Sequence, residues 1–416
     1  MMKSFYHRSF PRLFVIILTF GLTCLNLVSC AQGPLAITAE PNTMVPKIIT
    51  IEVSVTTTPL PPSPIPAPQV QPLAYTGNWL LASPMTIARG FHTATVLDDG
   101  RVLIVGGYTS LDTDTARVEI FDPATNTFNE TGSLRTARHG HSATLLTDGR
   151  VLVIGGYALP QGWLSDAEIY DPETEQWSTT QPLFPHGVCH TATLLDDGRV
   201  LVMGGSIRSG HPGSDDRVEI FDPDTNHWQK AAYHEHTESC QTATLLEDGR
   251  VLIAGGLANP TIYDPATDTW DSAGKLNTPR SQAQAVLLQS GRVLLIGGLS
   301  FDGKPTHSVE IYDVDSNTWQ ETAQLKQARY NHTATLLPDG RVLVLGGWET
   351  YNGYESSLLD TAEIYDETDE TWSTLSPLNI GRANHTATLL PEGQILVTGG
   401  QTSRGVLLNS VEILGQ

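Results

Sequence analysis

The sequence predicts an all-β protein whose main domain is a seven-bladed β-propeller. The first observation is a Gly-Gly doublet that recurs seven times, at 106–107, 155–156, 204–205, 255–256, 297–298, 346–347 and 399–400. A fixed period near 50 residues is typical of propeller arrays. The second observation is that every period repeats the same order of short apolar segments and turns. The third is the way in which the two ends of the array complement each other.

The repeat is clearest between residues 141 and 177. The first segment is followed by Asp148-Gly149, which predicts a type I′ hairpin turn. Four strands are expected, at 141–146, at 150–154, at 167–170 and from Trp177 onward. Four short antiparallel strands with turns at fixed offsets make one blade. Glycines at the doublet let neighbouring sheets approach, and the aromatic residue of the fourth strand fills the space between blades.

The ends of the array predict how the ring closes. Residues 76–85, which contain Trp79, have the pattern of a fourth strand with no blade before it. Residues 410–414 have the pattern of a third strand with no tryptophan after it. The N-terminal strand is therefore expected to complete the last blade, which removes exposed sheet edges.

These motifs resemble the kelch repeat family. The resemblance rests on the double glycine, the Glu-Ile-Tyr-Asp-Pro segment and the following Trp, and it covers roughly residues 76–414. It implies four-stranded kelch blades. Kelch propellers include peptide-binding adaptors of ubiquitin ligases and also the galactose and glyoxal oxidases, so the resemblance alone does not decide between binding and catalysis.

The N-terminus has the pattern of an export signal. Three basic residues precede an apolar run that begins at Leu13 and ends in Leu27-Val28-Ser29-Cys30. The last four residues resemble the lipobox of bacterial lipoproteins, which implies lipidation of Cys30. We expect a signal peptide at 1–29, a Pro-rich linker at 30–74 and the propeller at 75–416. An ordinary cleaved signal, giving a secreted soluble protein, and an uncleaved anchor are the alternatives.

Charge and composition exclude several classes of function. The chain has 24 Lys and Arg against 45 Asp and Glu, a net charge of −21. Such a surface repels polyanions, so nucleic-acid binding and a polybasic membrane-binding face are not expected. Contact with a membrane is expected only through the lipid anchor, and the protein is expected to be a monomer.

One face of the propeller is expected to carry the ligand. The turns between strands 1 and 2 and between strands 3 and 4 are short and uniform, whereas the other connections vary in length and chemistry. Variable loops on a rigid framework are where function concentrates. The candidate binding residues there are Trp348, Tyr351 and Tyr354 in the longest loop and Trp163, with Tyr157 and Tyr108, in the loops of the second and first blades. Tyr330, before the first strand of the sixth blade, is a further candidate. These residues suit sugar rings or peptide side chains; the alternative is that they pack within their own loops.

Two sets of charged or titratable residues recur at fixed positions. His92, His141, His190, His332 and His385 occupy one repeat position, and we interpret them as part of the framework. Arg89, Arg138, Arg280, Arg329 and Arg382 lie three residues earlier, and glutamates recur on the third strand. Ion pairs within or between blades are expected. Alternatively Arg138 and Arg329 line the mouth of the ring and accept an anionic group.

The third and fourth blades depart from this pattern. Gly187 and Glu238 replace the arginine, and Cys189 and Cys240 occupy equivalent positions two residues later. Three interpretations stay open. The thiols form a disulfide, which needs Cα atoms within roughly 7 Å; they stay free; or they bind a metal together with His186, His234 or His236.

The sequence favours a non-catalytic, exported binding module for a protein or carbohydrate, with no cofactor and no catalytic residues. The rival is an oxidase-like or sugar-acting enzyme with its site at the axial mouth. Tyr330 and His332 lie where the galactose oxidase resemblance implies a Tyr-His pair, but Asn331 separates them and no second set of Tyr with Cys is evident.

Overall fold

The computed structural model describes residues 75, 77–109, 113–180, 186–206, 218–234, 240–256, 259–350 and 357–415. The chain divides into two compact units, residues 1–67 and 68–416, and all of the described residues belong to the second. The expected signal peptide, Cys30 and the Pro-rich linker lie outside the described residues. Every regular element within these residues is a β-strand, as the sequence predicts.

Seven four-stranded antiparallel sheets are found among the described residues, and we number them blades 1 to 7. From the innermost strand outward, blade 1 contains β3 (Thr93–Val96), β4 (Val102–Val105), β7 (Val118–Asp122) and β8 (Thr127–Glu130). Blade 2 contains β9 (Ser142–Leu145), β10 (Val151–Ile154), β13 (Ala167–Asp171) and β14 (Gln176–Thr179). Blade 3 contains β15 (Val188–Leu194), β16 (Val200–Ser206), β17 (Val218–Asp222) and β18 (His227–Lys230).

Blades 4 to 7 follow in the same order of strands. Blade 4 contains β19 (Thr242–Leu245), β20 (Val251–Ala254), β21 (Thr261–Asp264) and β22 (Thr269–Ser272), and blade 5 contains β24 (Gln284–Leu287), β25 (Val293–Ile296), β27 (Val309–Asp313) and β28 (Thr318–Glu321). Blade 6 contains β29 (Thr333–Leu336), β30 (Val342–Leu345), β31 (Ala362–Asp366) and β32 (Thr371–Leu375). Blade 7 contains β33 (Thr386–Leu389), β34 (Ile395–Thr398), β35 (Val411–Leu414) and β1 (Trp79–Leu81).

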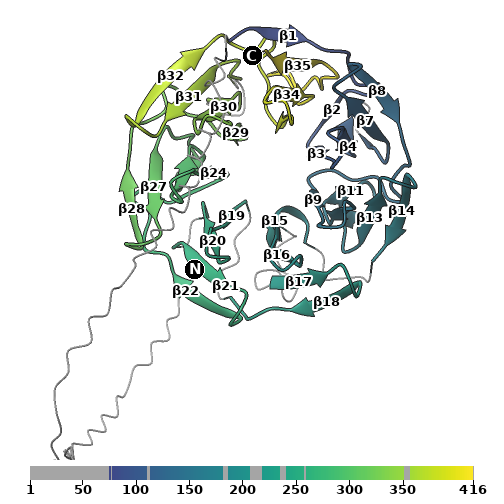
Figure 1. Cartoon of the computed structure of the whole chain (residues 1–416). Helices are drawn as coiled ribbons and strands as arrows, with labels where there is room; N and C mark the ends of the chain where they lie inside the picture. Colours follow the sequence, from purple (N-terminus) through teal and green to yellow (C-terminus); the bar gives the residue numbers. More distant parts are fainter. Residues whose placement is uncertain are drawn as a thin grey trace, which may run out of the picture. The chain divides into compact units, whose positions relative to one another are not determined.

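The blades of this unit are arranged around a central axis, with β3, β9, β15, β19, β24, β29 and β33 innermost (Figure 1). Each of these strands contacts the innermost strand of the next blade, and β33 of blade 7 contacts β3 of blade 1. The outermost strand of blade 7 comes from the other end of the unit, because β1 pairs with β35 in the register Leu80↔Ile413.

Short strands extend some blades beyond the main sheets. Blade 1 has a small additional sheet of three strands, β2 (Arg89–Gly90), β5 (Tyr108–Thr109) and β6 (Thr113–Asp114). Blade 2 has an additional pair, β11 (Tyr157–Ala158) with β12 (Gly162–Trp163). In blade 5, β23 (Arg280–Ser281) pairs with β26 (Leu299–Ser300). All three small sheets lie in the connections between strands 2 and 3 and at the entry to strand 1.

The hydrophobic core lies between the blades. The second strand of a blade is buried on both of its faces, as in β4 with the sequence Val-Leu-Ile-Val. One apolar cluster joins Leu103 of blade 1 to Val153 of blade 2, and another joins Leu396 of blade 7 to Ile104 of blade 1. Each pair of neighbouring blades shares one such cluster. The apolar seam therefore runs around the whole ring.

The hairpin between strands 1 and 2 differs from the expected type I′ turn. That turn needs positive φ at both central residues, but only Gly149 (φ 84°) has it in Asp148-Gly149. The N–H of Leu146 donates to the carbonyl of Arg150, and the N–H of Gly149 donates back to Leu146. The loop thus has three residues and ends in a left-handed glycine, the common three-residue hairpin geometry.

The Gly-Gly doublet makes room for the entry of the next blade. A Cβ atom on Gly106 (φ 60°) would lie 2.6 Å from the carbonyl oxygen of Arg138 and 2.9 Å from the ring of His141. The N–H of Gly107 donates to the same Arg138 carbonyl at 2.8 Å. Neither the space nor the backbone conformation suits another residue here.

Repeated polar groups hold the entry segments in place. Arg89, Arg138, Arg280, Arg329 and Arg382 are fully buried, and each pairs with the glutamate on the third strand of its own blade at 2.5–2.7 Å. The expected ion pairs are thus present within blades. At the rim, the indole N–H of Trp177 donates to the carbonyl of Gly132 in the preceding blade, and Trp270, Trp319 and Trp372 of blades 4, 5 and 6 make the equivalent hydrogen bond.

Four of the five repeated histidines join neighbouring blades near the axis. The Nε2 atom of His141 lies 3.0 Å from the hydroxyl of Thr93 in blade 1, and that of His385 lies 3.1 Å from Thr333 in blade 6. Burial lowers the pKa of His190 and of His385 to about 3, and it holds the pKa of His141 well below 6.5. These imidazoles are therefore neutral at pH 7 and serve as framework residues.

We expect Arg329→Met to lower the free energy of unfolding by about 3–5 kcal/mol, because it leaves the buried Glu363 carboxylate without its partner. Urea denaturation measures the change. The exposed pair Arg117–Glu130 provides the control, since Arg117→Met should cost less than about 1 kcal/mol. Arg329→Met with Glu363→Leu should recover most of the loss. Equal costs for the buried and exposed variants would contradict the assignment.

Stability should also fall as the pH drops from about 6.5 toward 3. The unfolded chain binds protons at its histidines below pH 6.5, whereas folded His190 and His385 stay neutral until about pH 3. His385→Gln, which copies Gln241 of blade 4, should reduce the slope of unfolding free energy against pH by up to about 1.4 kcal/mol per pH unit. The exposed His227→Gln is the control. An unchanged slope in His385→Gln would show that this histidine is not the source.

Candidate functional site: the variable-loop face

The propeller has two unlike faces. We call the one with the strand 1–2 and strand 3–4 turns the tight-turn face, and the one with the strand 2–3 and strand 4–1 connections the variable-loop face. Tyr75, the first residue that the structure describes, lies on the tight-turn face, because its hydroxyl donates to the carbonyl of Gly393, the hairpin glycine of blade 7.

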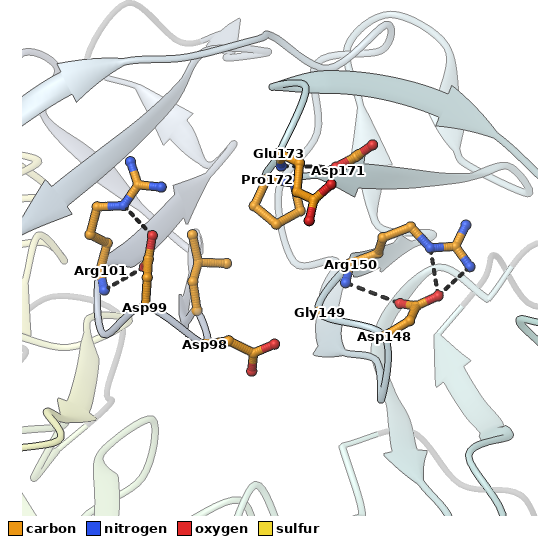
Figure 2. A pocket seen from close by; sticks show the side chains of 10 residues that line it. Asp98, Asp99, Arg101, Asp148, Gly149, Arg150, Asp171, Pro172 and Glu173 are labelled. Atoms are coloured by element: carbon orange, nitrogen blue, oxygen red, sulfur yellow. Dashed lines mark hydrogen bonds and ion pairs between the residues drawn. The ribbon is translucent and has the colours of Figure 1, made fainter.

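The tight-turn face is a repeated surface of charged turns. Figure 2 shows its groove between blades 1 and 2, about 420 Å³ in volume, where Arg101 pairs with Asp99 and Arg150 pairs with Asp148. A similar groove of about 230 Å³, lined by Asp248 and other turn residues, lies between blades 4 and 5, and there Arg292 pairs with Glu367 of blade 6. Because equivalent turn residues line both grooves, we interpret them as features of the repeat rather than a specific site.

Exposed apolar side chains gather on the other face. Within the described ranges, large apolar side chains with high exposure on the variable-loop face are Phe91 (39%), Leu159 (46%), Tyr233 (65%), Phe301 (83%) and Val406 (57%). They come from five different connections around the ring. The remaining two, Leu80 and Leu81, lie on the outer strand β1, and none lies on the tight-turn face.

A ring of left-handed residues surrounds the axis on this face. One residue at each blade entry has φ between 50° and 62°: Phe91, Gly140, Cys189, Cys240, Gln282, Asn331 and Asn384. Backbone N–H groups of several donate to the carbonyl of the equivalent residue one blade earlier, for example Gly140 to Phe91 and Gln282 to Cys240. The same position therefore presents Phe, Gly, Cys, Gln or Asn at the mouth of the ring, depending on the blade.

The axial cavity below this mouth is polar and uncharged. It has a volume of about 580 Å³ and is lined by threonines and alanines of the innermost strands, by Asn331 and Asn384, and by the repeated histidines. Burial lowers the pKa of those histidines, so they carry no charge at pH 7.

Cys189 and Cys240 are joined as a disulfide across blades 3 and 4. Their Cα atoms are 4.5 Å apart, within the range that a disulfide needs. The N–H of Cys240 also donates to the carbonyl of Cys189 at 3.0 Å. Of the three interpretations that the sequence leaves open, this structure contains the disulfide.

His186 and His234, which the metal alternative would use as ligands, make other contacts in this structure. His186 takes the place of the missing arginine, because its Nε2 atom lies 3.0 Å from the Glu219 carboxylate of its own blade. His234 packs on the ring of Trp270, with centroids 4.2 Å apart, and His236 lies outside the described residues. In the part of the chain that the structure describes, no three His, Cys, Asp or Glu side chains gather to hold a metal ion.

A cluster that sequence reasoning missed lies between blades 1 and 2. The Nδ1 atom of His139 lies 2.5 Å from Oδ1 of Asp114, whose Oδ2 accepts a hydrogen bond from the backbone N–H of Leu159. The rings of Phe91, Tyr108 and Tyr157 lie 5.6–5.9 Å from the imidazole, and Trp163 packs edge-on against Tyr157. His139 differs from its equivalents, such as Gly90 and Ser281, so a comparison of repeats would have found it. No pattern in the sequence indicates that the side chain of Asp114 contacts His139 of the next blade.

The predicted binding residues fall into three groups. Trp348 and Tyr330 are 8% and 7% exposed and pack together with Ala383, so they lie in a small apolar core. Tyr351 and Tyr354 lie outside the described residues. Trp163 is half-buried and belongs to the His139 cluster.

Arg138 and Arg329 lie below the surface rather than at the mouth. Both are fully buried, and their guanidinium groups donate to Glu168 and Glu363 and to backbone carbonyls. In this structure neither guanidinium presents a donor to an anionic ligand, because carboxylate and carbonyl groups of its own blade accept its hydrogen bonds.

Sequence comparisons agree with the geometry of the blades. Residues 78–256 match the family model described as the KLHDC2/KLHL20/DRC7 Kelch-repeats domain, and residues 261–410 match the Attractin/LZTR1 beta-propeller model. The described unit is thus a β-propeller of repeated four-stranded sheets. Over these residues the chain is similar to kelch-repeat and β-propeller domains. No curated protein matches its sequence significantly.

Among solved structures, the chain is similar to a fungal alcohol oxidase of the AA5 family in complex with copper. The TM-score is 0.69 at 19% sequence identity, over 81% of this chain and 76% of that one. At this identity the similarity shows the fold alone, and copper and oxidation are properties of that protein.

Both residues of the expected Tyr-His pair are buried. Tyr330 packs beside Trp348 and Ala383, and His332 is 2% exposed beneath the mouth. The described residues contain no helix that is long and apolar enough to cross a membrane.

Removing the disulfide should destabilise the protein by up to about 4 kcal/mol, since it closes a loop of 51 residues. The variant is Cys189→Asn with Cys240→Asn, because Asn331 and Asn384 already occupy this left-handed position. Urea unfolding of protein purified from an oxidising compartment measures the difference. Two free thiols in the wild-type protein, or equal stability of the two proteins, would contradict the prediction.

Proposed function

We propose that this chain is an exported, non-catalytic binding module that recognises a partner protein through its variable-loop face. The observation that carries the proposal is the distribution of exposed apolar side chains. Phe91, Leu159, Tyr233, Phe301 and Val406 belong to the connections of that face, whereas the tight-turn face carries charged turns. Aromatic side chains are enriched at protein interfaces.

The spread of these residues around the ring favours a protein over a small molecule. They belong to five connections rather than to one pocket. A protein interface buries roughly 800 Å² on each partner, which a face of this breadth can supply. The paired backbone hydrogen bonds around the mouth hold the loop bases in place, which lowers the entropy cost of binding.

Export and anchoring are part of the proposal and rest on the N-terminal pattern with Cys30.

A selection from a random peptide display library tests the proposal. The surface variant carries Phe91→Asn, Leu159→Ser, Tyr233→Ser, Phe301→Ser and Val406→Ser. The matched control changes the tight-turn face by Asp99→Ser and Arg101→Gln, residues that Ser290 and Gln394 already supply at these repeat positions. Selected peptides should bind the wild type and the control equally, and the surface variant at least tenfold more weakly.

Two results would overturn the proposal. Peptides that bind the surface variant as well as the wild type would place the site elsewhere. Failure to select any peptide, with binding of soluble oligosaccharides instead, would make the ligand a carbohydrate.

A further inference from the structure

The His139 cluster is the part of the variable-loop face with the most specific chemistry. Its Asp-His pair occurs once among the described blades, at a position that is Gly, Val, Ser, Tyr or Ala elsewhere. The imidazole is one-fifth exposed and the carboxylate of Asp114 is 1% exposed. A buried carboxylate thus supports a histidine that is open to solvent.

The partner of Nδ1 determines what the exposed nitrogen can do. An ionised carboxylate only accepts hydrogen bonds, so Nδ1 of His139 carries the proton and donates to Asp114. In the neutral ring Nε2 is then the acceptor. The second hydrogen bond to Asp114, from the backbone of Leu159, fixes the carboxylate and with it the tautomer.

The walls around this acceptor are aromatic. Phe91, Tyr108 and Tyr157 surround the imidazole, and Trp163 extends the cluster through its edge-on contact with Tyr157. Aromatic rings pack favourably against further aromatic rings in tilted or edge-to-face geometry. The cluster therefore places an imidazole nitrogen beside several aromatic rings.

Resting on the proposed function, we propose that this cluster is the anchor site of the variable-loop face and binds a tryptophan or tyrosine side chain of the partner protein. The ring of that side chain packs against Tyr157 and Trp163, and its N–H or O–H donates to Nε2 of His139. Asp114 is a positioning residue that holds the imidazole. Tryptophan and tyrosine are the side chains that combine a large ring with one such donor, and they are enriched at interface hot spots.

The test uses small probes, so that it does not depend on finding the partner. Saturation-transfer NMR of the full-length protein with indole and with 1-methylindole compares two rings that differ by one donor. We expect indole to bind about fivefold more tightly than 1-methylindole, and methyl glucoside to give no transfer. Nitrogen-15 shifts of the His139 ring should show a protonated Nδ1 in the wild type and a mixture of tautomers in Asp114→Asn.

Variants taken from other repeats keep the fold intact. His139→Ser copies Ser281 of blade 5 and should remove the preference for indole, while Tyr157→Gln copies Gln401 of blade 7 and should weaken both probes at least fivefold. Asp99→Ser, which copies Ser290 and lies on the tight-turn face, should change neither.

Equal binding of the two indoles, retention of binding in Tyr157→Gln, or transfer to methyl glucoside alone would overturn the anchor assignment. If selected peptides bind the face but are insensitive to His139→Ser and Tyr157→Gln, the proposed function stands and the anchor fails. If indole binds as expected and no peptide is selected, the site stands and the proposed function fails.

Discussion

The structure depends on one constraint, that each blade is apolar on both of its faces. A second strand such as β4 is fully buried only when a neighbouring sheet covers each side. Every blade therefore needs two neighbours, and a linear array would leave two apolar faces in water. The cluster that joins Leu396 of blade 7 to Ile104 of blade 1 meets this need. The pairing of β1 with β35 supplies the outer strand that blade 7 otherwise lacks.

Most of the arginine and histidine side chains that recur in the repeat serve this framework. The buried arginines pair with glutamates and donate to carbonyls, and most of the repeated histidines bridge blades as neutral rings. Chemistry that is available to a ligand is therefore found where the repeat is broken. Blades 3 and 4 lose the arginine and gain the Cys189–Cys240 disulfide, and blade 2 gains His139 with the support of Asp114.

The candidate site could be predicted only in part, and the tryptophans show why. Trp163 and Trp348 lie in loops of similar composition, yet the first is half-buried in the His139 cluster and the second packs in a core with Tyr330. Exposure depends on how far a loop folds back on its neighbour, which local sequence does not encode. Cys189 and Cys240 were recognisable as equivalent positions, but whether their Cα atoms come within bonding distance depends on the spacing of adjacent innermost strands.

The sequence by itself determined the repeat, the order of strands within it, the pairing of arginine with glutamate and the distinction between tight turns and variable loops. Those features follow from local spacing, because turns, strand alternation and doublets are read within a few residues. The tertiary structure alone decided the three-residue hairpin geometry, the burial of Trp348 and Arg329, and the meeting of Asp114 with His139. Each of these depends on contacts between segments that only the packing of one blade on the next brings together.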